Sequence, residues 1–221
     1  MAVLEGGVSA ALAGIGAESG SPLHVVTKPD PAGALGHYKT SHRCVMVSTQ
    51  GASSRFFELR NGSTTNVVVI HKVRVEWTQT AAHTVAILSS LDIYKCTAFS
   101  VVDTTNTVTP VISKLRTSFA TAGVEVRGLT VAGVAAGMTG GTLVKDTAPL
   151  RQFGLWLLAA VPTAGPTPRI TGEYWPDVGR GESPLILVQN EGFSIENRVL
   201  LGAAAGSAVS IDVAWSELTA Y

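Results

Sequence analysis

The stretch Val67-Val-Val-Ile-His-Lys-Val-Arg-Val-Glu-Trp77 decides the fold class of this chain. In its second half, apolar residues alternate with charged ones. Successive side chains of a β-strand point to opposite faces of a sheet, so this period of two predicts a strand with one apolar and one charged face. We expect one face to carry Val67, Val69, His71, Val73, Val75 and Trp77, and the other to carry Val68, Ile70, Lys72, Arg74 and Glu76.

The C-terminal region repeats this alternation. Val209, Ile211, Val213 and Trp215 alternate with polar or small residues from Ser210 to Ser216. Two alternating strands that each end in tryptophan are predicted to be elements of one core. Whether they are direct neighbours in a sheet stays open at this stage.

Shorter apolar or β-branched runs between and around these two predict further strands. Two near-continuous apolar runs, 153–160 and 185–189, are predicted to be central strands covered on both faces. We expect 193–201 to form a hairpin with the strand before it, through a turn at Asn190-Glu191-Gly192. Asn61-Gly62-Ser63 is interpreted as another hairpin turn. The remaining predicted strands are 44–49, 55–59, 85–99 (one bent strand or two), 108–115 and 124–131.

Frequent turn signals between about ten short strands favour an all-β fold, an antiparallel β-sandwich of jelly-roll type over residues 37–221. Residues 1–36 are rich in Gly, Ala, Ser and Pro and include Lys28-Pro-Asp-Pro31. Proline fixes φ and removes a backbone donor, so this segment is predicted to be an extended N-terminal arm. A disordered tail is the alternative.

Composition excludes several classes of protein. Of the 221 residues, 46% are hydrophobic and only 14% are charged, which rules out a disordered polar chain. Sixteen basic and sixteen acidic residues give a net charge of zero, so we expect no nucleic-acid partner. No apolar run reaches the roughly 18 residues of a membrane-spanning helix, so we expect no membrane partner. A surface this poor in charge predicts an assembly.

The cysteines and histidines give little sign of chemistry. Cys44 and Cys96 are predicted to be buried free thiols, with a single disulfide as the alternative. The five histidines form no HExxH motif, and His71 is interpreted as a hydrogen-bonded core or half-buried residue. His37 and His42 could approach one another across a turn. We predict no metal, no cofactor and no catalytic residue.

One turn-rich loop carries the remaining candidate site. Glu173, Asp177 and Glu182 flank Tyr174 and Trp175 there. Paired carboxylates are what a glycosidase needs, although exposed carboxylates in a loop are common. Tyr174 and Trp175 are predicted as a possible glycan or partner contact, since an aromatic face can stack on a sugar.

Four segments are similar to a family of tailed-bacteriophage virion structural proteins. They are Ala34-Leu-Gly-His-Tyr38, Lys114-Leu-Arg-Thr-Ser-Phe119, Ser183-Pro-Leu-Ile-Leu-Val-Gln-Asn-Glu-Gly-Phe193, and Val213-Ala-Trp-Ser-Glu-Leu218, followed by the end at Tyr221. The resemblance runs intermittently from about residue 33 to the end. It implies a β-rich virion component without catalytic residues.

Three functions follow as hypotheses. The first is a capsid decoration or cement protein, made in the host cytoplasm, that binds the outer capsid surface. Its partners would be the major capsid protein and copies of itself, as a homotrimer. The second is a receptor- or glycan-binding module of a tail fibre or spike, and the third is a hydrolase that uses the loop carboxylates. The absence of heptads favours the first over a fibre.

Overall fold

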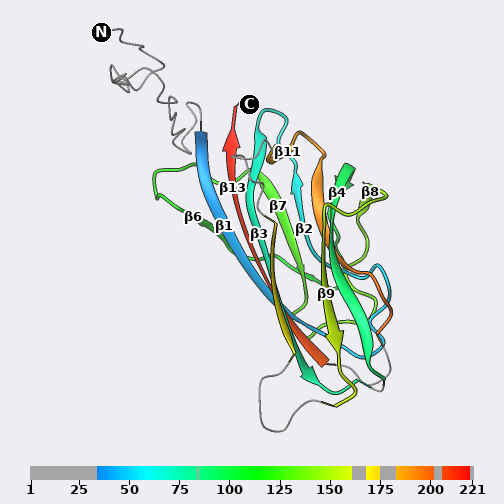
Figure 1. Cartoon of the computed structure of the whole chain (residues 1–221). Helices are drawn as coiled ribbons and strands as arrows, with labels where there is room; N and C mark the ends of the chain where they lie inside the picture. The colour runs from blue at the N-terminus through cyan, green and yellow to red at the C-terminus, as the bar shows by residue number, and fades with distance from the viewer. Residues whose placement is uncertain (1–33, 84, 161–167, 175–182, 202–205, 220–221) are drawn as a thin grey trace, which may run out of the picture.

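The computed structural model describes residues 34–83, 85–160, 168–174, 183–201 and 206–219. These residues form two antiparallel sheets that pack together as a sandwich (Figure 1), which confirms the predicted all-β antiparallel sandwich. The described part contains no helix long and apolar enough to cross a membrane. The strands are β1 (Ala34–Met46), β2 (Arg55–Asn61), β3 (Val67–Ala81), β4 (Ile87–Val101), β5 (Thr107–Val108), β6 (Ile112–Lys114), β7 (Val124–Leu129), β8 (Thr142–Lys145), β9 (Arg151–Leu157), β10 (Arg169–Tyr174), β11 (Leu185–Leu187), β12 (Gly192–Asn197) and β13 (Gly206–Leu218).

Sheet A has the strand order β10-β3-β13-β1-β6, with β11 also paired to β3. Its centre is the pairing of β3 with β13, the two strands that the alternation predicted, and Val73 lies opposite Val213. The start of β1 lies beside the end of β13, because Ala34 pairs with Leu218 (Figure 1). Strand β1 begins three residues before the predicted domain boundary at residue 37. Residues 34–36 therefore belong to the sandwich, and the rest of the predicted arm lies outside the described residues.

A register shift in the centre of sheet A corrects the predicted faces of β3. Ala214 pairs with Lys72 and Trp215 pairs with Ile70, so His71 is an extra residue on β3. Because of such a bulge, the side chains before it face the opposite side of the sheet from the one that strict alternation predicts. The core consequently takes Val73, Val75 and Trp77, as predicted, but also Val68 and Ile70, which were assigned to the other face.

Sheet B has the order β5-β7-β2-β12-β4-β8, with β9 also paired to β4. The predicted run 85–99 is a single strand, β4. Its first half pairs with β9 and its second half with β8, where the register shifts twice. The predicted strand 108–115 is divided instead at Pro110, so that β5 joins sheet B and β6 joins sheet A.

Two predicted central strands are not central. Strand β9 pairs with β4 and no other described strand, and its burial alternates, with Trp156 54% exposed. Among the described strands, β11 pairs only with β3, and Val188 just after it is 50% exposed. The prediction that both faces are covered was wrong, because a run of apolar residues does not reveal whether a second layer lies over it.

Two predicted hairpins are crossovers between the sheets. The turn at Asn190-Glu191-Gly192 carries the chain from β11 in sheet A to β12 in sheet B. Asn190 adopts the positive φ, at 60°, and Gly192 is required for a close approach: a Cβ on it would lie 2.2 Å from the Leu59 carbonyl oxygen. Asn61-Gly62-Ser63 likewise links β2 to β3 across the sheets. The Asn61 side chain is buried there and donates to the Asn66 and Leu187 carbonyls.

Large side chains from both sheets fill the core. Trp77 and Trp215 come from sheet A, and Phe57 and Phe193 come from sheet B, where their rings stack at 6.0 Å. Each such side chain stabilises the fold by roughly 1.5–3 kcal/mol through burial. Tyr38 stacks on Trp215 and donates its hydroxyl to the Ala120 carbonyl, which fixes the 112–120 segment against sheet A.

Candidate functional site

The outer face of sheet A is hollowed along β13. The floor consists of short side chains, and longer side chains of β1 and β3 rise on either side. Two successive hollows, of about 310 Å³ and 210 Å³, lie along this line. We call them together the sheet A groove. Its floor is Ala208, Ser210, Asp212 and Ala214; one wall is Lys39, Ser41 and Arg43; the other is Lys72, Arg74, Glu76, Thr78 and Thr80.

The two walls of the groove differ in how their charges are compensated. On the β3 wall, Lys72 pairs with Glu173 at 2.8 Å. Glu76 pairs with Arg169 at 2.9 Å and with Arg74 at 3.6 Å. On the β1 wall, Lys39 and Arg43 are exposed and make no ion pair within the described residues. Lys39 and Arg43 are therefore the cations of the groove that have no ion pair within the described residues.

The predicted acidic and aromatic loop contributes only two described residues. Glu173 belongs to β10 and forms the ion pair with Lys72. Tyr174 is half-buried and packs against the core cluster. Its ring therefore stabilises the sandwich edge. Trp175, Asp177 and Glu182 lie outside the described residues.

Two of the predicted histidine interpretations can be compared with the structure. His71 is half-buried and shares a hydrogen bond with the hydroxyl of Ser216, which also lies 2.6 Å from His37 Nδ1. A hydrogen-bonded, half-buried His71 is thus confirmed, although on the bulge and not on the inward face. His37 and His42 do not approach one another: they are five residues apart on one strand, so they point to opposite faces. His42 is buried beside Gly128.

Burial shapes the protonation of this histidine cluster. Loss of water around the ring lowers the pKa of His71, and the nearby His37 lowers the pKa further. The Ser216 hydroxyl has one proton, so it donates to one ring and accepts from the other. The cluster joins β1, β13 and β3 by side chains. Because Ser216 is only 1% exposed, the arrangement is a structural link and offers no accessible nucleophile.

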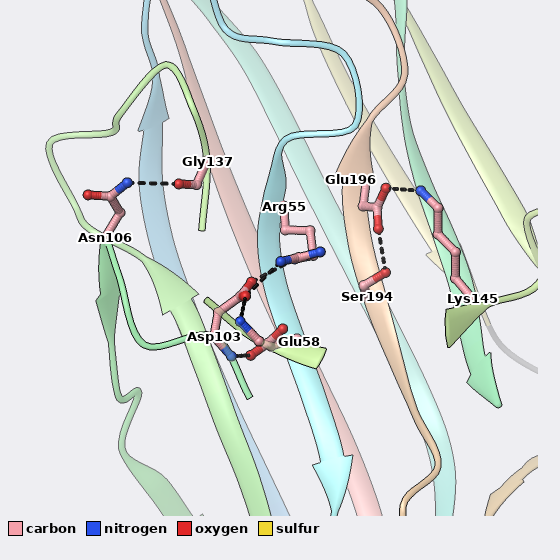
Figure 2. A network of polar contacts seen from close by, with 9 residues as sticks. Arg55, Glu58, Asp103, Asn106, Gly137, Lys145, Ser194 and Glu196 are labelled. Carbon is pink, nitrogen blue, oxygen red and sulfur yellow. Dashed lines mark hydrogen bonds and ion pairs between the residues drawn. The ribbon is translucent and has the colours of Figure 1, made fainter. Parts of the chain in front are cut away.

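A second polar network links sheet B to the segments beside it (Figure 2). Arg55 donates to both carboxylate oxygens of Asp103, each at 2.6 Å, and Asp103 also accepts from the Gly141 amide at 2.7 Å. The Asp103 amide donates to Glu58 Oε1 at 2.6 Å. Glu58 and Asp103 are fully buried. Burial, with the negative charge of Asp103, raises the pKa of Glu58 to about 8.

The neighbouring part of the network holds β8 to sheet B. Glu196 is buried and accepts from Lys145 and, at 2.9 Å, from the Ser194 hydroxyl (Figure 2). Asn106, at a φ of 61°, donates its side-chain amide to the Gly137 carbonyl at 3.0 Å. Because the carboxyl groups are enclosed, we interpret the network as an anchor for residues 103–106 and 137–145. Nothing in the sequence links Glu58 to Asp103, so the sequence analysis did not predict this buried contact.

Both cysteines are free and buried, as predicted. Cys44 lies on β1 in sheet A and Cys96 on β4 in sheet B, so the two thiols occupy different sheets. Burial raises the pKa of each thiol to about 12. A thiol held protonated in this way is a poor nucleophile. In the part of the chain that is described, no three His, Cys, Asp or Glu side chains are placed to hold a metal ion.

Exposed apolar side chains gather at one edge of sheet B. Leu88 on β4 is 58% exposed and lies opposite Trp156 on β9, which is 54% exposed. Val101 and Val144, on β4 and β8, are 45% and 59% exposed, but they lie at the opposite end of β4 from Leu88. We call Leu88 and Trp156 the apolar edge. Large apolar side chains grouped on a surface are typical of contacts with another protein.

Comparison of the chain with protein-family models and with curated proteins found no match in either case.

Proposed function

We propose that this chain is a structural protein of a bacteriophage virion whose sandwich is of jelly-roll type. Within this class we propose a particular role, that of a capsid decoration or cement protein on the outer capsid surface. The similarity of four segments to virion proteins supports the class. The charge-poor composition and the two-sheet fold agree with a component of a repeated protein lattice.

The apolar edge is the observation that carries the proposal. Leu88 and Trp156 are more than half exposed, although each belongs to a regular strand of a well-packed sheet. Apolar surface of this kind is stabilised when a neighbouring protein covers it. A decoration protein offers such neighbours in the major capsid protein and in copies of itself, here as a homotrimer.

The copy number of the chain in purified particles of the virus that encodes it tests the proposal. Quantitative mass spectrometry against the major capsid protein gives this number. Hundreds of copies are expected for a decoration protein. A dozen or fewer would place the chain in the tail or connector and overturn the decoration role, and absence from particles would overturn the virion assignment.

The predicted N-terminal arm gives a second, independent test of how the protein is held. Deletion of residues 2–30 is expected to weaken binding to capsids that lack the protein, because the predicted arm would add contacts that act together with those of the sandwich. Co-sedimentation with such capsids measures the loss. Unchanged binding would remove the arm as an anchor and leave the sandwich as the binding element.

The glycan-binding alternative has less support. It depended on Tyr174 and Trp175 as an aromatic platform, and Tyr174 packs against the core. A glycan array with wild-type protein and with the Tyr174→Ala, Trp175→Ala variant tests this alternative. Binding of wild type to a specific glycan that is lost in the variant would favour a receptor-binding module over a decoration protein.

A further inference from the structure

The β1 wall and the floor of the sheet A groove carry charges of alternating sign. Along β1, Lys39, Ser41 and Arg43 face outward, and β13 pairs with them in register. Ser41 lies opposite Asp212 and donates its hydroxyl to that carboxylate at 2.6 Å. The row therefore presents a cation, then a carboxylate, then a second cation.

The spacing of this row is set by the strand. Residues two apart on one face of a strand are separated by roughly 6.6 Å, so Lys39 and Arg43 stand about 13 Å apart, with Asp212 near the midpoint. An extended peptide has the same rise per residue. Its side chains i, i+2 and i+4 on one face match the three charges of the row.

We propose that the sheet A groove binds an extended segment of a partner protein that carries acidic residues at i and i+4 and a basic residue at i+2. The inference rests on the proposed function, because it supplies the chemistry of one protein contact of a decoration protein. The two acidic side chains would pair with Lys39 and Arg43. The basic side chain would pair with Asp212.

Other anionic ligands fit the groove less well. A nucleic acid or a sulfated polysaccharide carries negative charge at every repeat and would bring it against Asp212. A neutral glycan would lack the aromatic platform on which sugars stack, since no aromatic side chain lines either described hollow. The alternating charges of Lys39, Asp212 and Arg43 therefore favour an extended peptide as the ligand.

Exposed ion pairs are individually weak, so the contact would depend on repetition over a capsid surface. The first test therefore uses millimolar peptide and amide chemical shifts of the full chain. The probe is blocked Thr-Glu-Thr-Lys-Thr-Glu-Thr. Its matched control, Thr-Glu-Glu-Lys-Thr-Thr-Thr, has the same composition without the spacing. An all-acidic peptide, Thr-Glu-Thr-Glu-Thr-Glu-Thr, and a sulfated hexasaccharide are the other arms.

We expect the probe to shift amides of residues 39–43 and 210–214 at least threefold more than the rearranged peptide does. Lys39→Glu or Arg43→Glu should each remove most of this shift. Arg151→Glu, an equal charge change at an exposed site on β9, should leave it unchanged. Equal shifts with both Glu-Lys peptides, or larger shifts with the all-acidic peptide or the hexasaccharide, would overturn the proposal.

Experiments with virus particles and capsids distinguish a failure of this inference from a failure of the proposed function. Suppose that wild-type protein is present in hundreds of copies, and that the Lys39→Glu and Arg43→Glu proteins bind capsids no less tightly than the Arg151→Glu protein does. The groove is then not a contact with the capsid, although the decoration role stands. If the peptide binds but the chain is absent from particles, the groove stands and the virion role fails.

Discussion

Glu58 shows how one residue can set the pH dependence of this sandwich. Its carboxyl group is fully buried, and Oε2 has no hydrogen-bond partner among the residues that the structure describes. An unfolded carboxyl ionises near pH 4.5, whereas the folded one keeps its proton until about pH 8. Between these values the folded state binds more protons than the unfolded state. This group therefore makes the fold less stable as the pH rises through that window.

Replacement of Glu58 by glutamine is expected to remove this dependence. The difference in free energy of unfolding between Glu58→Gln and wild type should increase in favour of the variant by roughly 1–3 kcal/mol as the pH rises from 5 to 8, because the neutral amide has no proton to lose. Urea unfolding at several pH values measures the difference. Glu125→Gln, at a half-exposed partner of Arg60, is the control. Parallel curves for wild type and Glu58→Gln would contradict the raised pKa.

Ser216 is the second residue whose role is local and measurable. Its hydroxyl joins His37 on β1 to His71 on β3. Ser216→Ala should lower the free energy of unfolding by about 1–2 kcal/mol, because two half-buried rings each lose a partner. Ser210→Ala, on the same face of β13, is the matched control and should change stability little. Equal losses in the two variants would show that the hydroxyl bridge contributes nothing specific.

At the scale of elements, close approach between strands decides which glycines are required. Gly192 begins β12, and a Cβ there would lie 2.2 Å from a backbone oxygen of β2 and 2.7 Å from the Phe99 ring. Gly154 lies in β9, and a Cβ there would meet nothing nearer than 3.9 Å. Neither has a positive φ. The two positions therefore separate crowding from backbone conformation.

Gly192→Ala is expected to lower the free energy of unfolding by at least about 2 kcal/mol, since either the crossover or β2 must move. Gly154→Ala should be neutral or slightly stabilising, because alanine reduces the conformational entropy of the unfolded chain. Thermal and urea unfolding of both variants provide the comparison. A stable Gly192→Ala protein would mean that the crossover tolerates displacement.

At the scale of the whole molecule, the two outer faces differ in character. Sheet A presents a polar groove with short residues on its floor, and sheet B presents the apolar edge of Leu88 and Trp156. Under the proposed decoration role the chain needs contacts both with a shell and with its own copies. We propose the apolar edge for contacts between copies, since association of identical subunits favours apolar surface.

If copies associate through the apolar edge as proposed, the double variant Leu88→Lys, Trp156→Glu is expected to be a monomer with an unchanged circular dichroism spectrum. Both side chains are exposed, so the core is not affected. Sedimentation velocity gives the mass of each species. Val111→Lys, at an 81% exposed residue away from this edge, should leave association intact. A monomeric wild type, or a variant that still associates, would remove the edge as the interface.

Side-chain direction alternates with a local period of two, so most strands and the core face of β13 could be predicted from the sequence. The strands β8 and β10 and the first part of β1 were not predicted, because their residues show no clear alternation of apolar and polar side chains. The same local reasoning correctly predicted two buried free thiols. It could not predict the bulge at His71, which reverses the faces of the first part of β3.

Which strands are neighbours could be learned only from the folded chain, since backbone hydrogen bonds are the same for any pair of strands and do not specify the partner. The edge positions of β9 and β11, the two crossovers, the burial of Glu58 against Asp103 and the groove along β13 all follow from that choice. Each joins residues far apart in the chain.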